Sequence, residues 1–132
     1  MSRSNYSEDG DNWACIRWSG AVKSAMRGQR GQSFLKELLA AMDAMENKEL
    51  IADELEFNGQ FCALGVVGNK RGIDMSEIDP EDEREVSKAF GIARAMAHEI
   101  AYMNDEGVWW CEESPRHRWA RMREWVEEQI NE

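Results

Sequence analysis

The sequence predicts a mainly α-helical fold: a compact bundle of about four helices around a long central helix, with a small β-hairpin. Apolar residues recur at helical spacing over 79–104, and again over 33–47 and 115–130. Between these stretches, Asn58-Gly59 is the strongest short signal for a hairpin turn. The chain has 132 residues, enough for one domain whose core needs neither disulfides nor metal.

The central helix is predicted over 79–104. Asp79 can act as its N-cap, because a short side-chain oxygen accepts a hydrogen bond from a free amide, and Pro80 is favoured at the first helical position. Gly91 interrupts the pattern at a cost on the order of 1 kcal/mol relative to Ala, so we expect a kink, a break or a close helix contact there. The prediction is one long amphipathic helix, or two collinear pieces, against which the other segments pack. Its apolar stripe comprises Val86, Ala89, Phe90, Ala93, Met96, Ala97, Ile100 and Ala101.

The first third of the chain predicts an arm and two helices. Residues 1–11 are polar and predict a flexible N-terminal arm, with residues 12–132 forming a single helical domain. A short helix is expected from Asn12, and a glycine-rich turn over 28–31 should end it. A second helix then starts at Gln32 or Ser33 and ends at Asn47.

The middle and the end of the chain follow different patterns. Residues 62–68 fit either a strand or a short helix, and we favour a short helix after the hairpin, with a loop over 69–72. The last helix is predicted from Pro115, capped by Ser114, to about Ile130. Its inward face comprises Trp119, Met122, Val126 and Ile130.

Composition limits the classes of partner and compartment. The net charge is −10, which argues against a general nucleic-acid binder because binding phosphates needs a basic face. No apolar run approaches the roughly 20 residues that span a bilayer, and residues 1–13 lack the apolar core of a signal peptide. The three cysteines are widely separated, which is typical of reduced thiols. We therefore expect a cytoplasmic protein with no membrane partner and no direct nucleic-acid partner.

Residues that could carry catalysis or bind a metal show no diagnostic spacing. The cysteines and histidines form no CxxC, HxxxH or HExxH pattern. The glycines of 65–72 match neither the dinucleotide-binding nor the Walker A pattern, and turn formation accounts for them. Cys62 lies near a predicted turn where a histidine could approach it, so a small Cys/His-dependent enzyme is an alternative. We predict no catalytic, cofactor-binding or metal-binding residue and no cofactor.

The last helix supplies one candidate surface for a partner. Arg118 and Arg121 lie on the same flank as Trp125, and tryptophan and arginine are enriched in protein-binding hot spots. A tryptophan that covers the edge of the core under a stacked arginine explains the same pattern. Trp109 and Trp110 lie nearby in the sequence and could extend this Arg/Trp flank.

The second candidate surface is acidic and lies where the central helix is predicted to begin. The positive end of a helix dipole favours carboxylates, so a solvated helix start is one interpretation and contact with a basic partner is another. We call this set the acidic surface: Glu77, Asp79, Glu81, Asp82, Glu83 and Glu85.

Five sequence pieces together resemble a known group of proteins. They are 30–39, 62–65, the pair 90–93 with 99–102, and 118–123, which read RGQSFLKELL from Arg30 to Leu39, CALG, FGIA with EIAY, and RWARMR. They resemble small acidic proteins of bacteriophages and prophages that have no assigned activity, and the resemblance covers most of the chain. It implies a phage or prophage setting inside a bacterial host cell.

From this setting we expect a non-catalytic accessory protein that binds a host protein complex, such as an inhibitor of anti-phage defence comparable to the anti-CRISPR proteins. One alternative is an acidic DNA mimic that occupies a nucleic-acid-binding groove. The other is the Cys/His-dependent enzyme, which thiol alkylation would test. A homodimer is a further expectation, because tryptophans and methionines near the C-terminus could bury against a second copy.

Overall fold

The computed structural model describes residues 12–106 and 112–130, with side chains from residue 19 onward. Most residues in these ranges are helical, and the ranges also contain one two-stranded antiparallel sheet. The predicted mainly helical fold with a small hairpin is therefore confirmed. In chain order the elements are α1 (Asn12–Arg27), α2 (Gln29–Asp43), β1 (Glu56–Phe57), β2 (Gln60–Phe61), α3 (Ala63–Arg71), the 3-10 helix η1 (Met75–Glu77), α4 (Glu83–Phe90), α5 (Arg94–Glu106) and α6 (Pro115–Gln129).

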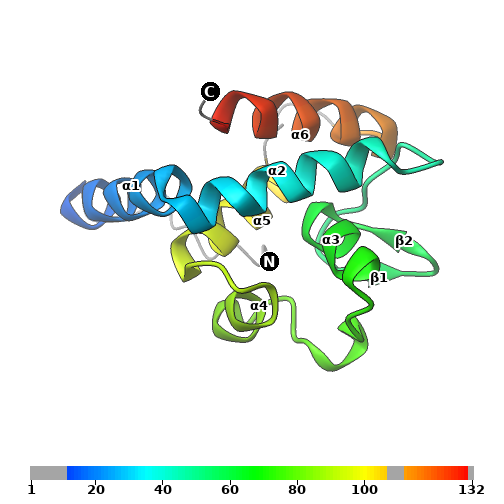
Figure 1. Ribbon diagram of the computed structural model, residues 1–132, viewed down its shortest axis with the longest axis horizontal. Coiled ribbons are helices and arrows are strands. Elements are labelled where there is room, and N and C mark those ends of the chain that lie inside the picture. The colour runs from blue at the N-terminus through cyan, green and yellow to red at the C-terminus, as the bar shows by residue number, and fades with distance from the viewer. Residues whose placement is uncertain (1–11, 107–111, 131–132) are drawn as a thin grey trace.

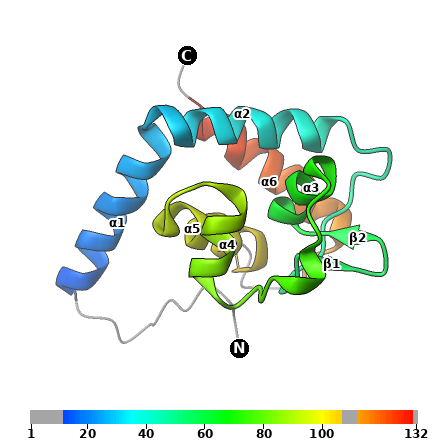
Figure 2. The same ribbon diagram turned by 60° about the horizontal axis from the view of Figure 1, so that its bottom comes forward.

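Two helices share the centre of the structure. Helix α2 packs against α1, α3 and α6, whereas α5 packs against α1, α3, α4 and α6. Figure 1 shows α6 running beside α2, and Figure 2 shows α1 descending at an angle from one end of α2. The space between these helices is filled by fully buried side chains that include Leu35, Leu38, Met42, Leu50, Met96, Ile100, Met122 and Val126.

The stretch predicted as one long helix forms two separate helices. The first ends at Phe90 because Gly91 adopts the left-handed conformation, with φ of 69°, and the amide of Ile92 donates to the carbonyl of Ser87. This arrangement closes a helix C-terminus. Helices α4 and α5 then pack against each other, so the predictions of a continuous helix and of two collinear pieces are both wrong.

The predicted N-cap is also corrected. Helix α4 begins three residues later than expected, and Asp82 is its cap, accepting hydrogen bonds from the amides of Arg84 and Glu85 at 3.0 and 3.3 Å. Asp79 instead accepts from the amide of Glu81 at 2.9 Å, in a turn that precedes the helix. Two aspartates three residues apart compete for the same role, and the local pattern does not decide between them.

The junction of α1 and α2 is tighter than a glycine-rich turn. The helix expected from Asn12 is confirmed, but α2 already begins at Gln29, and extended Gly28 lies between the two helices. Gly31 is a buried helical residue, and a Cβ added there would collide with the carbonyl oxygen of Ala25 in α1. Glycine at this position therefore permits a close approach of two helices.

The hairpin and the helix after it follow the sequence prediction closely. Asn58 and Gly59 have φ of 51° and 77°, as a two-residue type I′ turn requires, and Phe57 pairs with Gln60. The favoured short helix is confirmed as α3. It continues to Arg71 and ends at left-handed Gly72, so the predicted loop over 69–72 is wrong for its first three residues.

The last helix confirms its predicted start and inward face. The Ser114 side chain accepts a hydrogen bond from the amide of His117, and Pro115 occupies the first turn. Met122 and Val126 are fully buried, while Trp119 and Ile130 are partly buried against the core.

Across the described ranges, every helix is too short or too polar to span a bilayer.

Candidate functional site

The two arginines of the predicted Arg/Trp flank are directed into the protein. The side chains of Arg118 and Arg121 are 11% and 16% exposed. Arg118 donates to the carbonyls of Asn104 and Leu50 at 3.0 and 3.1 Å. Arg121 donates to the carbonyl of Met103 at 2.6 Å. Both guanidinium groups therefore hold α6 against the end of α5, and Arg118 also holds α6 against the segment before the hairpin.

Glu113 completes this cluster. Its side chain is 4% exposed and accepts two hydrogen bonds from Arg121, at 2.7 and 2.8 Å. Nδ1 of His117 lies 2.6 Å from the same carboxylate. Burial by itself would raise the pKa of Glu113, but the hydrogen bonds from Arg121 and His117 and the charges of Arg121 and Arg118 lower it overall. The carboxylate is therefore ionised at neutral pH and neutralises the guanidinium charges beside it.

Asn104 forms a second buried polar junction beside this cluster. Its side chain is fully buried, Oδ1 accepts from the amide of Ala63 at 3.1 Å, and Nδ2 donates to the carbonyl of Ile51 at 2.9 Å. Sequence analysis missed both Asn104 and Glu113. Asn104 belongs to no local motif, because its partners Ala63 and Ile51 are distant in the chain. The partners of Glu113 are close in the sequence, but no motif marks a carboxylate that is buried between two arginines.

Of the three tryptophans of this flank, the structure describes Trp125 alone. Trp125 is partly buried and packs against the hydrophobic core. Trp109 and Trp110 lie outside the described residues. The Arg/Trp flank thus contains two arginines that stabilise the fold and one tryptophan at the edge of the core, and its role in binding stays a prediction.

The acidic surface, by contrast, faces solvent at most of its positions. Five of its six residues, all except Glu83, are exposed. They lie on η1, on the turn after it and on the start of α4, a stretch that runs along one edge of the molecule in Figures 1 and 2. The carboxylates of Asp79 and Asp82 accept backbone amides within this stretch and so hold its turns in place.

Three carboxylates of the acidic surface remain available to a partner. We call Glu77, Glu81 and Glu85 the outer glutamates. All three are exposed, and the described residues supply none of them with a side-chain hydrogen bond or salt bridge. Their negative charge is therefore not neutralised within the described fold.

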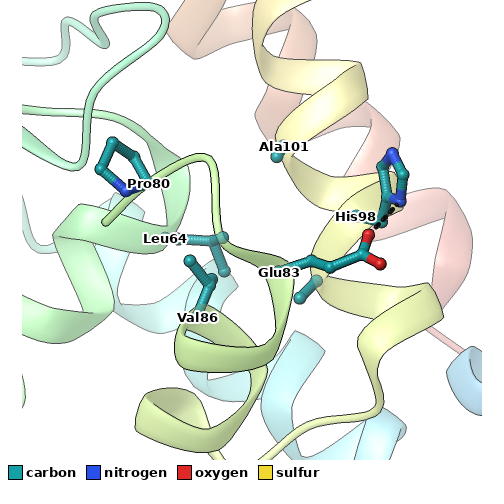
Figure 3. Close-up of a pocket in the computed structure, with 7 residues that line it drawn as sticks. Leu64, Pro80, Glu83, Val86, His98 and Ala101 are labelled. Carbon is teal, nitrogen blue, oxygen red and sulfur yellow. Dashed lines mark ion pairs between the residues drawn. The ribbon is translucent and has the colours of Figure 1, made fainter. Parts of the chain in front are cut away.

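Glu83 differs from its neighbours because it points inward (Figure 3). Oε2 of Glu83 lies 2.7 Å from Nδ1 of His98, a residue of α5 that is 8% exposed. Arg94 forms a further salt bridge to the other oxygen of Glu83. Burial lowers the pKa of His98 more than the Glu83 carboxylate raises it, so this histidine is neutral at pH 7.

The cavity beside this pair is too small for a substrate. Its volume is about 10 Å³, and its lining includes Leu64, Pro80 and Val86 together with Glu83 and His98 (Figure 3). A space of this size holds at most one water molecule. The His98–Glu83 pair therefore joins two helices beside a cavity that is too small for a substrate.

Cys62, the nucleophile of the enzyme alternative, acts as a helix cap. It is fully buried, and its Sγ accepts a hydrogen bond from the amide of Gly65 at 3.4 Å. His98 and His117 each contact a glutamate. Within the described ranges, no three His, Cys, Asp or Glu side chains are grouped as a metal site requires.

Comparisons with protein family models, with curated protein sequences and with solved structures found no match. The geometry therefore supplies the argument about function. Among the described residues, the acidic surface is an extended, charged and solvent-facing feature.

Proposed function

We propose that this protein is a non-catalytic binding protein that docks onto a basic region of a host protein complex through its acidic surface. The observation that carries the proposal is the set of outer glutamates, which are exposed and unpaired among the described residues. Hydrogen bonds accepted by Asp79 and Asp82 hold the turns of the backbone that carries them, so little backbone entropy is lost when a partner binds.

The distribution of charge along the chain supports this proposal. Residues 44–106 carry fifteen acidic and six basic side chains, a net charge of −9, within a chain whose total is −10. Between Arg71 and Arg84 the sequence contains no cation. Such a one-sided charge steers a basic partner toward this region and raises the rate of association.

The phage or prophage resemblance supplies the biological setting of the proposal. A small accessory protein in that setting would act on a host complex, and a component of anti-phage defence is the target we propose. Binding that covers a functional surface of such a complex inhibits it without any catalytic residue. The chain then needs a stable fold and a complementary surface.

A DNA mimic is the second candidate, and one observation favours it. From Asp74 to Glu83 the chain contains six carboxylates without an intervening cation. A row of negative charges can occupy a groove that otherwise holds nucleic-acid phosphates. The two candidates differ in a simple way, because added duplex DNA would displace a mimic from its partner but would not displace a protein bound elsewhere.

The test is affinity capture from a lysate of a bacterium that carries the gene, followed by binding measurements with each purified partner. The key variant replaces the outer glutamates by glutamine (Glu77→Gln, Glu81→Gln, Glu85→Gln). The matched control removes the same charge at other exposed positions (Glu46→Gln, Glu124→Gln, Glu128→Gln). We expect the key variant to lose the partner, the control to keep it, and added salt to weaken wild-type binding.

Equal loss of the partner in both variants would show that only net charge matters, and full retention in the key variant would reject the acidic surface. Trp125→Ala in the same assay tests the Arg/Trp flank. Its thermal unfolding must be measured alongside, because Trp125 packs on the core. Sedimentation of the wild-type chain tests the expected homodimer.

A further inference from the structure

Phe57 is the one large hydrophobic residue that is exposed among the described side chains, at 56%. It lies outside the hydrophobic core cluster, although Leu55, two residues earlier, is 3% exposed. Alternate residues of a strand share a face, so Phe57 extends the apolar face of the hairpin beyond the edge of the core. A single exposed apolar residue is common on protein surfaces, and the surroundings of Phe57 therefore decide what it can do.

The hairpin holds the Phe57 ring on a rigid support. Asn58 and Gly59 have the left-handed φ values of a type I′ turn directly beside it. On the far edge of the hairpin, the amide of Ile51 donates to the carbonyl of Phe61 at 2.9 Å. An aromatic side chain on a preformed turn loses little entropy when it is buried by a partner, and aromatic residues dominate binding hot spots.

The charge around Phe57 has one sign. Between Lys48 and Lys70 the sequence contains no lysine or arginine, but it contains four carboxylates. Three of these, Asp53, Glu54 and Glu56, are exposed, and the described residues give the side chains of Glu54 and Glu56 no salt bridge or hydrogen bond. The exposed ring is thus flanked by negative charge that the fold leaves unpaired, and this repels nucleic acids and anionic membranes.

We propose that the tip of this hairpin, Glu56–Gly59, is a protein-docking element. Phe57 inserts into an apolar pocket of a partner protein, and lysine or arginine at the rim of that pocket pairs with Glu54 and Glu56. This inference does not rest on the acidic surface. The hairpin precedes the start of α3 and η1 follows its end, so different segments carry the two features (Figure 1).

The test selects peptides from a random library displayed on phage, with the full chain as bait, and then measures the affinity of the selected peptides. We expect a consensus in which an apolar residue adjoins lysine or arginine. A synthetic consensus peptide should bind Phe57→Val at least about tenfold more weakly than wild type. It should bind Phe57→Trp as tightly as wild type.

The choice of variants separates docking from hairpin stability. Valine preserves strand propensity while removing the ring. Gln60→Ala changes the cross-strand partner of Phe57 but leaves the Phe57 ring in place. Glu54→Gln with Glu56→Gln should weaken binding and reduce its dependence on salt. Replacing the outer glutamates should leave peptide binding unchanged, so this result stands or falls separately from the proposed function.

Three results would overturn the inference. They are a library that yields no enriched peptide, selected peptides that bind Phe57→Val as tightly as wild type, and a consensus without basic residues.

Discussion

Nδ1 of His98 lies 2.7 Å from Oε2 of Glu83, and this contact joins the middle of α5 to the first turn of α4. Glu83 belongs to the acidic surface, and its contact with His98 connects the start of α4 to α5. Because the His98 side chain is buried, its protonation is coupled to the stability of the whole fold.

Stability should fall as pH drops below about 6.5, the ordinary pKa of histidine. Burial lowers the pKa of folded His98 and the charge of Arg94 adds to this effect, while the opposing effects of Glu83 and Glu99 do not reverse it. The unfolded chain therefore binds a proton that the folded chain does not, and the free energy of unfolding decreases with falling pH. Urea unfolding at a series of pH values measures this slope.

His98→Gln should flatten that slope between neutral pH and about pH 5.5. His117→Gln serves as the control because the His117 side chain is 61% exposed. An identical slope in wild type and His98→Gln would contradict the assignment.

Glu113→Ala should destabilise the protein by about 3 kcal/mol or more, because it leaves two partly buried guanidinium groups without their carboxylate. Glu112→Ala, at an exposed position, should change the free energy of unfolding by less than about 0.5 kcal/mol. Urea unfolding at neutral pH compares the two variants. Similar values for both would mean that the cluster contributes little to stability.

Two glycines should respond in opposite directions to alanine. Gly20 lies within α1, and a Cβ added there has no atom within 4 Å, so Gly20→Ala should stabilise the protein by about 0.5–1 kcal/mol. Gly31→Ala forces a Cβ onto the carbonyl of Ala25 and should cost roughly 1–3 kcal/mol. Thermal unfolding of both variants tests this close approach of α1 and α2. Stabilisation by Gly31→Ala would refute it.

Asp82→Ala should cost about 1 kcal/mol, because the amides of Arg84 and Glu85 lose their shared acceptor. Asp79→Ala removes one acceptor in a turn outside the helix and should cost less. The two free energies of unfolding, measured in parallel, decide where α4 begins. The reverse order would restore Asp79 as the cap.

Local chemistry explains which parts of the fold the sequence could predict. The hairpin needs two adjacent residues with positive φ, and Asn58-Gly59 supplies them. The last helix starts where a serine cap precedes a proline, and both are visible in the sequence. These features depend on neighbours within four residues, so a single sequence is enough to predict them.

The features that sequence analysis missed depend on distant partners. The sequence predicts that Gly31 lies in a turn. The carbonyl that excludes a side chain there is that of Ala25, which belongs to another helix. Arg118 and Arg121 looked like surface residues because their acceptors lie elsewhere in the chain; Leu50, for example, is 68 positions away from Arg118.

Five of the six residues of the acidic surface are exposed, as charged residues outside an apolar stripe usually are. Glu83 departs from this pattern because its partner His98 lies on the next helix. No local signal identifies that pairing.

The contacts between α6 and the segment before the hairpin also affect how the chain folds. The amide of Leu50 donates to the carbonyl of Pro115. The guanidinium group of Arg118 in turn donates to the carbonyl of Leu50. During synthesis the middle of the chain leaves the ribosome well before these partners exist, and long-range closures of this kind slow folding. The hairpin and α3 can form early, but their final attachment waits for α6.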